Sequence, residues 1–152
     1  MAKNVMVCVT QQKTCERLIL KGNELIESEE DKLFVIHVVN EKENFLQNSN
    51  DGEALEYLFR VSKKAGADLT VLRSKNILKT MMDFAIDNRI THIIMGQPRI
   101  NKQVNSSNIV LKLQKALPEV EFIKLWHFLW EVFSFLHIIR TAEYYRLYKG
   151  GL

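Results

Sequence analysis

The segment Val5–Val9 is apolar at every position, so an extended strand there would present two hydrophobic faces. The segment Phe34–Ile36 has the same character. A strand with one face in water would alternate apolar and polar residues, whereas continuous apolar strands are typical of parallel sheets covered by helices on both faces. These two segments therefore predict an α/β fold.

Strand-like and helical segments alternate from Asn4 to about Leu125. The expected strands are Val5–Thr10, Leu33–Val39, Asp68–Leu72, Ile90–Met95 and Val120–Leu125. Between the strands, residues at helical spacing predict four helices, each with one stripe of residues that faces inward. The first stripe is Cys15, Leu18, Ile19, Gly22, Leu25 and Ile26, and the second is Leu55, Leu58, Phe59, Ser62 and Ala65. The third is Ile77, Leu78, Met81, Met82, Ala85 and Ile86, and the fourth is Val110, Leu113, Ala116 and Leu117. A strand–helix repeat of roughly 25–35 residues is typical of right-handed βαβ units. The pattern predicts a three-layer α/β/α domain with a five-stranded parallel sheet.

The ends of the expected helices carry recognisable residues. Thr14 and Asn76 are N-cap candidates, and Asp51 would open the second helix. Gly66 would end the second helix, and Pro118 would stop the fourth.

Composition excludes several classes of function. The chain has 152 residues, which suits one main domain, and its net charge of +3 gives no concentrated basic face for nucleic acid. The two cysteines lack CxxC spacing, and the four histidines lack the spacing of a zinc site. The N-terminus reads as a strand and not as a signal peptide. We expect reduced thiols, no metal and a cytoplasmic location.

The chain changes character after Leu125. Residues 126–148 hold eight of the fourteen aromatic residues, interrupted by charged and polar ones, which disfavours a transmembrane helix. We therefore divide the chain into a domain at 1–125 and a C-terminal aromatic amphipathic extension at 126–152. The extension could cover an apolar surface of its own domain, mediate a homodimer or partner contact, lie at a membrane interface, or be a non-native addition.

Parallel sheets bind ligands at the carboxyl ends of their strands, where the strand order reverses. Gly96 would let a ligand approach the backbone, and Arg99 adds positive charge nearby. Ser107 and Asn108 are expected at a helix start, whose free amides favour an anion. The candidate binding residues are Thr10, Gln12, His37, Gly96, Arg99, Ser107 and Asn108.

The segments NVMVCVT, CERLILKGNELI, KLFVIHVV, GADLTVL, ITHIIMGQPR and NIVLKLQKALPEVEFIKL occur in an order that resembles the universal stress protein superfamily. The most similar branch is the domain found in bacterial potassium-responsive sensor kinases of the Kdp type. The resemblance covers about Asn4–Leu125. It implies strand order 3-2-1-4-5, frequent dimerisation, and ATP, AMP or cyclic di-AMP as possible ligands.

The binding motifs of that superfamily are only partly present. Nucleotide-binding members carry Gly-x-x-Gly followed by Gly-Ser or Gly-Thr; here Gly96 matches the first glycine, while Arg99 replaces the second and Ser107-Asn108 the final pair. Gln11 and Gln12 stand where an aspartate is usual. Of the cyclic di-AMP motifs, Thr10 keeps a hydroxyl and His37 keeps a ring.

Catalysis is not expected, because the chain has no Gly-x-x-x-x-Gly-Lys phosphate loop and no pyrophosphatase loop after the first strand. Cys8 reads as a core residue. Cys15 also reads as packed inward, with a pKa that a helix start could lower modestly. The sequence predicts a non-catalytic module that requires no cofactor, and the resemblance implies that it is regulatory and binds an adenine nucleotide in stress or potassium signalling. The alternative is an interaction or dimerisation module with a vestigial nucleotide site.

Overall fold

The computed structural model describes residues 1–9, 12–41, 49–96 and 103–125. Within these ranges the side chains of residues 12–14, 49–51 and 103–108 are not described. The expectations for Thr10, for Arg99 and for the extension at 126–152 therefore fall outside the described residues.

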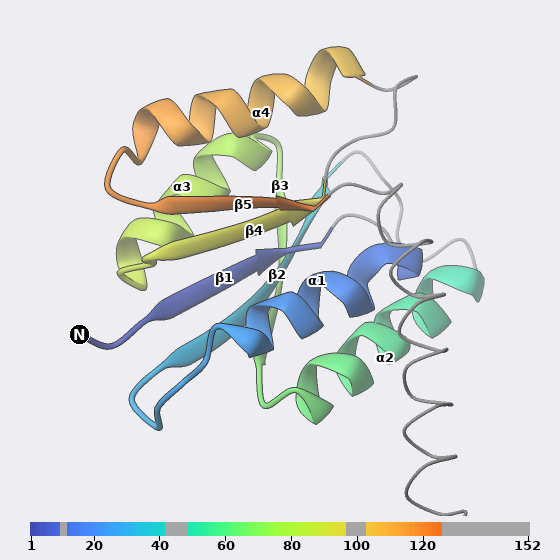
Figure 1. Cartoon of the computed structure of the whole chain (residues 1–152). Coiled ribbons are helices and arrows are strands. Elements are labelled where there is room, and N and C mark those ends of the chain that lie inside the picture. The colour runs from blue at the N-terminus through green and yellow to red at the C-terminus, as the bar shows by residue number, and fades with distance from the viewer. Residues whose placement is uncertain (10–11, 42–48, 97–102, 126–152) are drawn as a thin grey trace, which may run out of the picture.

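Five strands and four helices alternate along the chain, as the sequence predicted (Figure 1). Their bounds are β1 Asn4–Cys8, α1 Gln12–Glu24, β2 Lys32–Asn40, α2 Ser49–Lys64, β3 Asp68–Ser74, α3 Ile77–Asp87, β4 His92–Gly96, α4 Gln103–Ala116 and β5 Glu121–Leu125. The strands form one sheet in the order β3-β2-β1-β4-β5, and every pairing is parallel. The predicted order and the predicted three-layer architecture are both confirmed.

Strand β1 lies at the centre of the sheet, paired with β2 on one side and β4 on the other. Val5 and Val7 pack into the core that contains residues of α1 and α2. Met6 and Cys8 pack into a second core with residues of α3 and α4. Figure 1 shows the two helix pairs on opposite faces of the sheet. The apolar run in β1 is thus buried on both faces because each face has its own helical layer.

Two predicted helix starts are wrong. Helix α1 begins at Gln12, so Thr14 lies within its first turn, and α2 begins at Ser49 instead of Asp51. The first difference accompanies an earlier strand end, because β1 ends at Cys8, two residues before the expected Thr10.

The other helix ends follow the prediction. Asn76 caps α3, accepting a hydrogen bond from the Lys79 amide at 3.1 Å. Gly66 follows α2 with φ of +70°, a conformation in which a Cβ atom would be strained. Helix α4 ends at Ala116, before Pro118.

Two residues expected in the core are exposed. Phe59 on α2 is 54% exposed and Ile86 on α3 is 60% exposed. Their neighbours Leu58 and Ala85 are buried, which shows that each helix buries a narrower stripe than its apolar pattern indicates. A helix residue lies about 100° around the axis from the one before it, so a side chain at the stripe margin points past the sheet.

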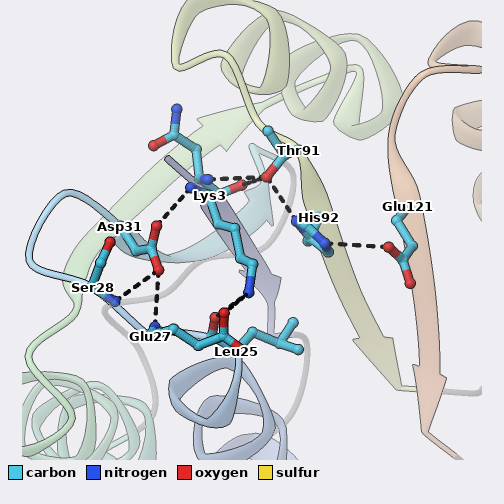
Figure 2. A network of polar contacts seen from close by, with 9 residues as sticks. Lys3, Leu25, Glu27, Ser28, Asp31, Thr91, His92 and Glu121 are labelled. Atoms are coloured by element: carbon cyan, nitrogen blue, oxygen red, sulfur yellow. Dashed lines mark hydrogen bonds and ion pairs between the residues drawn. The ribbon is translucent and has the colours of Figure 1, made fainter. Parts of the chain in front are cut away.

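At the amino ends of the strands, backbone amides donate hydrogen bonds to a carboxylate (Figure 2). The Asp31 carboxylate accepts hydrogen bonds from the amides of Lys3 at 2.8 Å, Glu27 at 2.9 Å and Ser28 at 3.1 Å. These amides stabilise the charged form, so they hold the pKa of Asp31 well below its ordinary value. Asp31 therefore connects the chain ahead of β1 to the turn between α1 and β2.

A second set of contacts joins β1, β4 and β5 at the same edge (Figure 2). The Thr91 hydroxyl oxygen accepts the Asn4 amide at 3.0 Å and lies 2.7 Å from Nδ1 of His92. Nε2 of His92 lies 3.3 Å from a carboxylate oxygen of Glu121. The amino ends of three neighbouring strands are thus linked through side chains as well as through the backbone ladder.

We predict that Gly22→Ala destabilises the fold by about 1–3 kcal/mol. A Cβ atom at Gly22 would lie 2.7 Å from Cγ2 of Val7 and 2.8 Å from Cδ1 of Leu33, where the helix meets the sheet. The matched control is Gly52→Ala, because a Cβ atom there meets nothing within 4 Å. We expect the control to be neutral or stabilising by up to about 1 kcal/mol, since alanine favours helix. Chemical denaturation measures both, and equal stabilities would contradict the close approach at Gly22.

We predict that Asp31→Asn lowers stability at neutral pH and that its effect shrinks in acid. The lowered pKa of Asp31 means that its stabilisation is present above the unfolded pKa of about 3.9 and is lost as pH falls toward the folded pKa. Melting temperatures of the wild type and the variant should therefore converge between about pH 5 and pH 2. A difference independent of pH would show that the carboxylate charge is not the cause.

Candidate functional site

The candidate site lies at the carboxyl edge of the sheet, between β1 and β4. The chain progresses from β1 through β2 to β3 on one side, then returns past β1 to β4 and β5 on the other. Strands β1 and β4 are thus adjacent but lead to opposite halves of the sheet, which is the arrangement where α/β proteins form ligand crevices. Gly96 ends β4 beside Leu125 at the end of β5.

His37 fixes the end of β1. Its Nδ1 lies 2.8 Å from the carbonyl oxygen of Val9, and the Val9 amide donates to the Ile36 carbonyl at 2.9 Å. Because a carbonyl can only accept, Nδ1 carries the proton in this contact. The ring is half-buried in β2 and holds the last described residue before positions 10–11. Its Nδ1 atom is therefore engaged by the backbone at the end of β1.

Gly96 is not required by the described packing. A Cβ atom there would lie 3.6 Å from Cδ1 of Leu18 and 3.9 Å from Nη2 of Arg17, which are ordinary contact distances. Gly66, not Gly96, is the glycine with positive φ among the described residues. Neither the backbone conformation nor the described neighbours explain why glycine stands at the end of β4.

Arg17 belongs to this region, and the sequence reasoning missed it. It extends from α1, its side chain is 5% exposed, and its guanidinium reaches the Cβ position of Gly96. Burial lowers the pKa of Arg17 below its ordinary value. A signal was available: helical side chains lean toward the helix N-terminus, so a basic residue early in the helix after the first strand points to the carboxyl edge.

The remaining candidates are only partly placed. Gln12 is the first residue of α1, the element that follows β1 along the chain. Ser107 and Asn108 were expected at a helix start, but α4 begins at Gln103, so both lie in its second turn. Amides in the second turn of a helix donate to carbonyls four residues earlier, so those of Ser107 and Asn108 are not free. The amides without a partner in the helix are those of the first turn, which begins at Gln103. The structure thus places His37 against Val9 next to the end of β1 and Gly96 at the end of the neighbouring strand β4, while Gln12 begins α1.

The cysteines offer no activated nucleophile. Both are free thiols in the core. Burial raises the pKa of Cys8 to about 12. The modest lowering expected for Cys15 is wrong: burial, and then the charge of Glu16, raise its pKa. The effect of burial outweighs the backbone amides that favour the thiolate at the helix start.

Two further kinds of site concern the described ranges 1–9, 12–41, 49–96 and 103–125. No group of three or more His, Cys, Asp or Glu side chains there is arranged to hold a metal ion. None of the helices in these ranges combines the length and apolar character needed to cross a lipid bilayer.

Comparison with known proteins found no matching family model and no matching curated protein. Solved structures do match. The universal stress protein from Archaeoglobus fulgidus aligns with a TM-score of 0.56 at 18% identity, over 82% of this chain and 98% of that one. Its complex with dAMP aligns with a TM-score of 0.52 at 17% identity, over 82% and 97%.

A universal stress protein in complex with cAMP aligns with a TM-score of 0.53 at 10% identity, covering 81% of this chain and 96% of that one. At these identities the likeness concerns the fold, and it extends over nearly the whole length of each neighbour. The described part of the chain has the α/β fold seen in universal stress proteins.

Proposed function

We propose that the chain is a non-catalytic regulatory module that binds an adenine nucleotide at the carboxyl ends of β1 and β4. The observation that carries this proposal is the reversal of strand order between β1 and β4, with a glycine at the end of β4 that the described packing does not require. A position without a side chain at such a crevice lets a ligand approach the backbone closely.

The chemistry of the edge supports an anionic ligand. Arg17 places a guanidinium beside Gly96, and α1 begins at Gln12 just beyond β1. The first amides of a helix are unbonded within it and carry the positive end of its dipole. A phosphate group between these elements would meet positive potential from both.

The bound ligands of the fold neighbours indicate the adenine class. One neighbour is in complex with cAMP and another with dAMP. The candidate ligands are therefore AMP, ATP and, following the sequence resemblance of residues 4–125, cyclic di-AMP. That resemblance also suggests a place in stress or potassium signalling, within a cytoplasmic domain of Kdp type.

A non-catalytic role fits the described side chains. The raised pKa values of Cys8 and Cys15 keep both thiols protonated at neutral pH, so neither is a ready nucleophile. His37 engages the backbone through Nδ1, which suits an anchoring role better than a proton shuttle between two partners.

An interaction module is the second candidate, and exposed apolar side chains favour it. Leu20 on α1 and Leu111 on α4 are 46% and 52% exposed, on opposite faces of the sheet. Large exposed apolar side chains can contribute to contacts with a partner or a second copy. In this reading the strand-end crevice is vestigial.

We predict that AMP, ATP or cyclic di-AMP stabilises the full chain. A ligand at about 100 times its dissociation constant adds roughly 2.7 kcal/mol, which corresponds to a rise in Tm of roughly 5–10 °C for a chain of this size. Thermal-shift measurements across the three ligands, and acid extraction of the purified protein to detect bound nucleotide, test this. The absence of any shift and of any extracted nucleotide would overturn the proposal.

We predict that Gly96→Ala weakens binding about tenfold or more while the fold keeps its stability within about 0.5 kcal/mol. The added Cβ meets Leu18 and Arg17 at ordinary distances, so only a ligand at the strand end would be crowded. Gly52→Ala is the control for a glycine remote from the edge. Unchanged affinity in Gly96→Ala would place the ligand elsewhere.

For the interaction module, the test is removal of the residues after Leu125, followed by measurement of oligomeric mass. If the extension mediates self-association, the shortened chain should have a lower mass than the full chain at equal concentration. An unchanged mass would exclude the extension as the dimerising element.

A further inference from the structure

Strand β3 lies at one edge of the sheet, and in the described part of the chain it pairs with β2 alone. This pairing runs without a bulge from Phe34↔Asp68 to Asn40↔Ser74. The middle of the strand, Leu69–Leu72, contains no charged residue and no proline. Proteins usually protect an edge strand with a bulge, a proline or a charge, because its outward backbone groups can pair with another strand. The middle of β3 has none of these protections.

The backbone groups that point away from β2 belong to alternate residues of β3. The Glu41 amide donates to the Ser74 carbonyl at 3.3 Å, so the backbone groups of Ser74 point toward β2. Successive residues of a strand direct these groups to opposite sides. Those of Thr70 therefore also point toward β2, whereas those of Leu69 and Val71 point outward. Val71 is thus the outward-directed residue at the centre of the strand.

The side chain of Val71 is apolar and 39% exposed. It lies on the same face of the sheet as Leu69, which packs against the core that contains residues of α1 and α2. Helices α1 and α2 lie side by side on that face (Figure 1). A second exposed apolar side chain, Phe59 on α2, is 54% exposed.

Phe59 lies on the flank of α2 that faces the β3 edge. On the other flank, the Tyr57 hydroxyl donates to a carboxylate oxygen of Glu16 on α1 at 2.7 Å. Residues two apart in a helix lie about 200° apart around its axis, so Phe59 points away from α1. Helix α1 contacts β1 and β4, while α2 contacts β3, so this direction leads to the β3 edge. Val71 and Phe59 thus border the same edge on one face.

The charges at the two ends of β3 make the edge complementary to itself. Asp68 begins the strand, and Lys75 directly follows its end. The Lys75 side chain is 84% exposed, and its Nζ lies 3.9 Å from a carboxylate oxygen of Glu41, a weak pair in water. Antiparallel pairing of two copies, with Val71 opposite Val71, would place Asp68 opposite Ser74 of the second copy and beside its Lys75. Parallel pairing in register would bring like charges together instead.

We propose that the β3 edge is a self-association surface, on which β3 of a second copy of this chain pairs in antiparallel orientation with Val71 at the twofold axis. The two outward-directed Val71 residues exchange both of their backbone hydrogen bonds, and the two sheets become continuous. A twofold axis perpendicular to the sheet keeps each face on its own side. Phe59 of both copies therefore lies on the same face, next to the junction.

The other edge strand is less suited to such pairing. Strand β5 carries the exposed charges of Glu121 and Lys124 within its short length. The β3 edge is also separate from the candidate ligand site between β1 and β4, so self-association at β3 does not depend on nucleotide binding.

Sedimentation equilibrium of the full chain tests the proposal. We expect wild type to form a dimer, and Val71→Lys to raise its Kd about tenfold or more, because two like charges would meet at the axis. The matched control is Ile86→Lys on α3, which adds the same charge at a side chain that is 60% exposed on the other face. Its Kd should stay within about twofold of wild type. A monomeric wild type, or equal Kd values for the two variants, would overturn the proposal.

Removal of the residues after Leu125 separates this surface from the C-terminal extension. The shortened chain should keep the dimer mass, since β3 is intact. A monomeric shortened chain would assign the association to the extension and overturn the proposal.

Charge exchange tests the antiparallel register. Asp68→Lys places a cation beside Lys75 of the second copy and should raise Kd roughly two- to fivefold. Adding Lys75→Asp to that variant restores unlike charges, and Kd should return to within about twofold of wild type. Additive weakening in the double variant would contradict this register.

Cross-linking gives a readout that does not depend on tolerance of a charge at position 71. Directly opposite residues of a hydrogen-bonded antiparallel pair have Cα atoms about 5.5 Å apart, which a disulfide can span. Val71→Cys should therefore form a disulfide-linked dimer under mild oxidation, whereas Ile86→Cys should not. The native thiols Cys8 and Cys15 are buried and do not compete. Equal cross-linking of the two variants, or none in Val71→Cys, would overturn the proposal.

Discussion

The structure depends on burying β1 on both of its faces. Val5 and Val7 face one helical layer while Met6 and Cys8 face the other, and all four are at most 2% exposed. A strand in that position needs a partner strand on each edge and a helical layer on each face. The order β3-β2-β1-β4-β5 supplies both, because right-handed crossovers on the two sides of β1 place their helices on opposite faces.

The same order gives the two edges of the sheet different properties. At the amino edge, Asp31 and Thr91 satisfy backbone amides and tie neighbouring segments together. At the carboxyl edge, the chain diverges into two halves between β1 and β4, which is the arrangement where α/β proteins form ligand crevices. The amino edge therefore ties the segments of the fold together, and the carboxyl edge is where we propose that a ligand binds.

The contacts at the carboxyl edge come from three separate elements. His37 in β2 holds the end of β1, Arg17 in α1 reaches the end of β4, and Gly96 leaves that end without a side chain. None of the three lies next to another along the chain. Their arrangement is a product of parallel pairing, which brings the carboxyl ends of all strands to one edge.

The sequence by itself determined the architecture. Apolar strands without alternation indicated a sheet that is packed by helices on both faces, and the helical stripes indicated those helices. Asn76, Gly66 and Pro118 indicated helix ends, through side-chain capping, a positive φ and the loss of a backbone amide. Such signals act within a few residues, so they can be read without knowing the fold. Of the candidate site, the sequence located Gly96 at the end of β4, whereas the expected strand end at His37 continues to Asn40.

Only the tertiary structure decided the rest. The exposure of Phe59 and Ile86 depends on how much of each helix the sheet covers, and the start of α4 at Gln103 moved Ser107 and Asn108 into the helix. In the sequence, Arg17 is not distinguished from the other charged residues of an amphipathic helix. It becomes a buried cation beside Gly96 only when α1 packs against β4, because burial and proximity are set by contacts between segments far apart in the sequence.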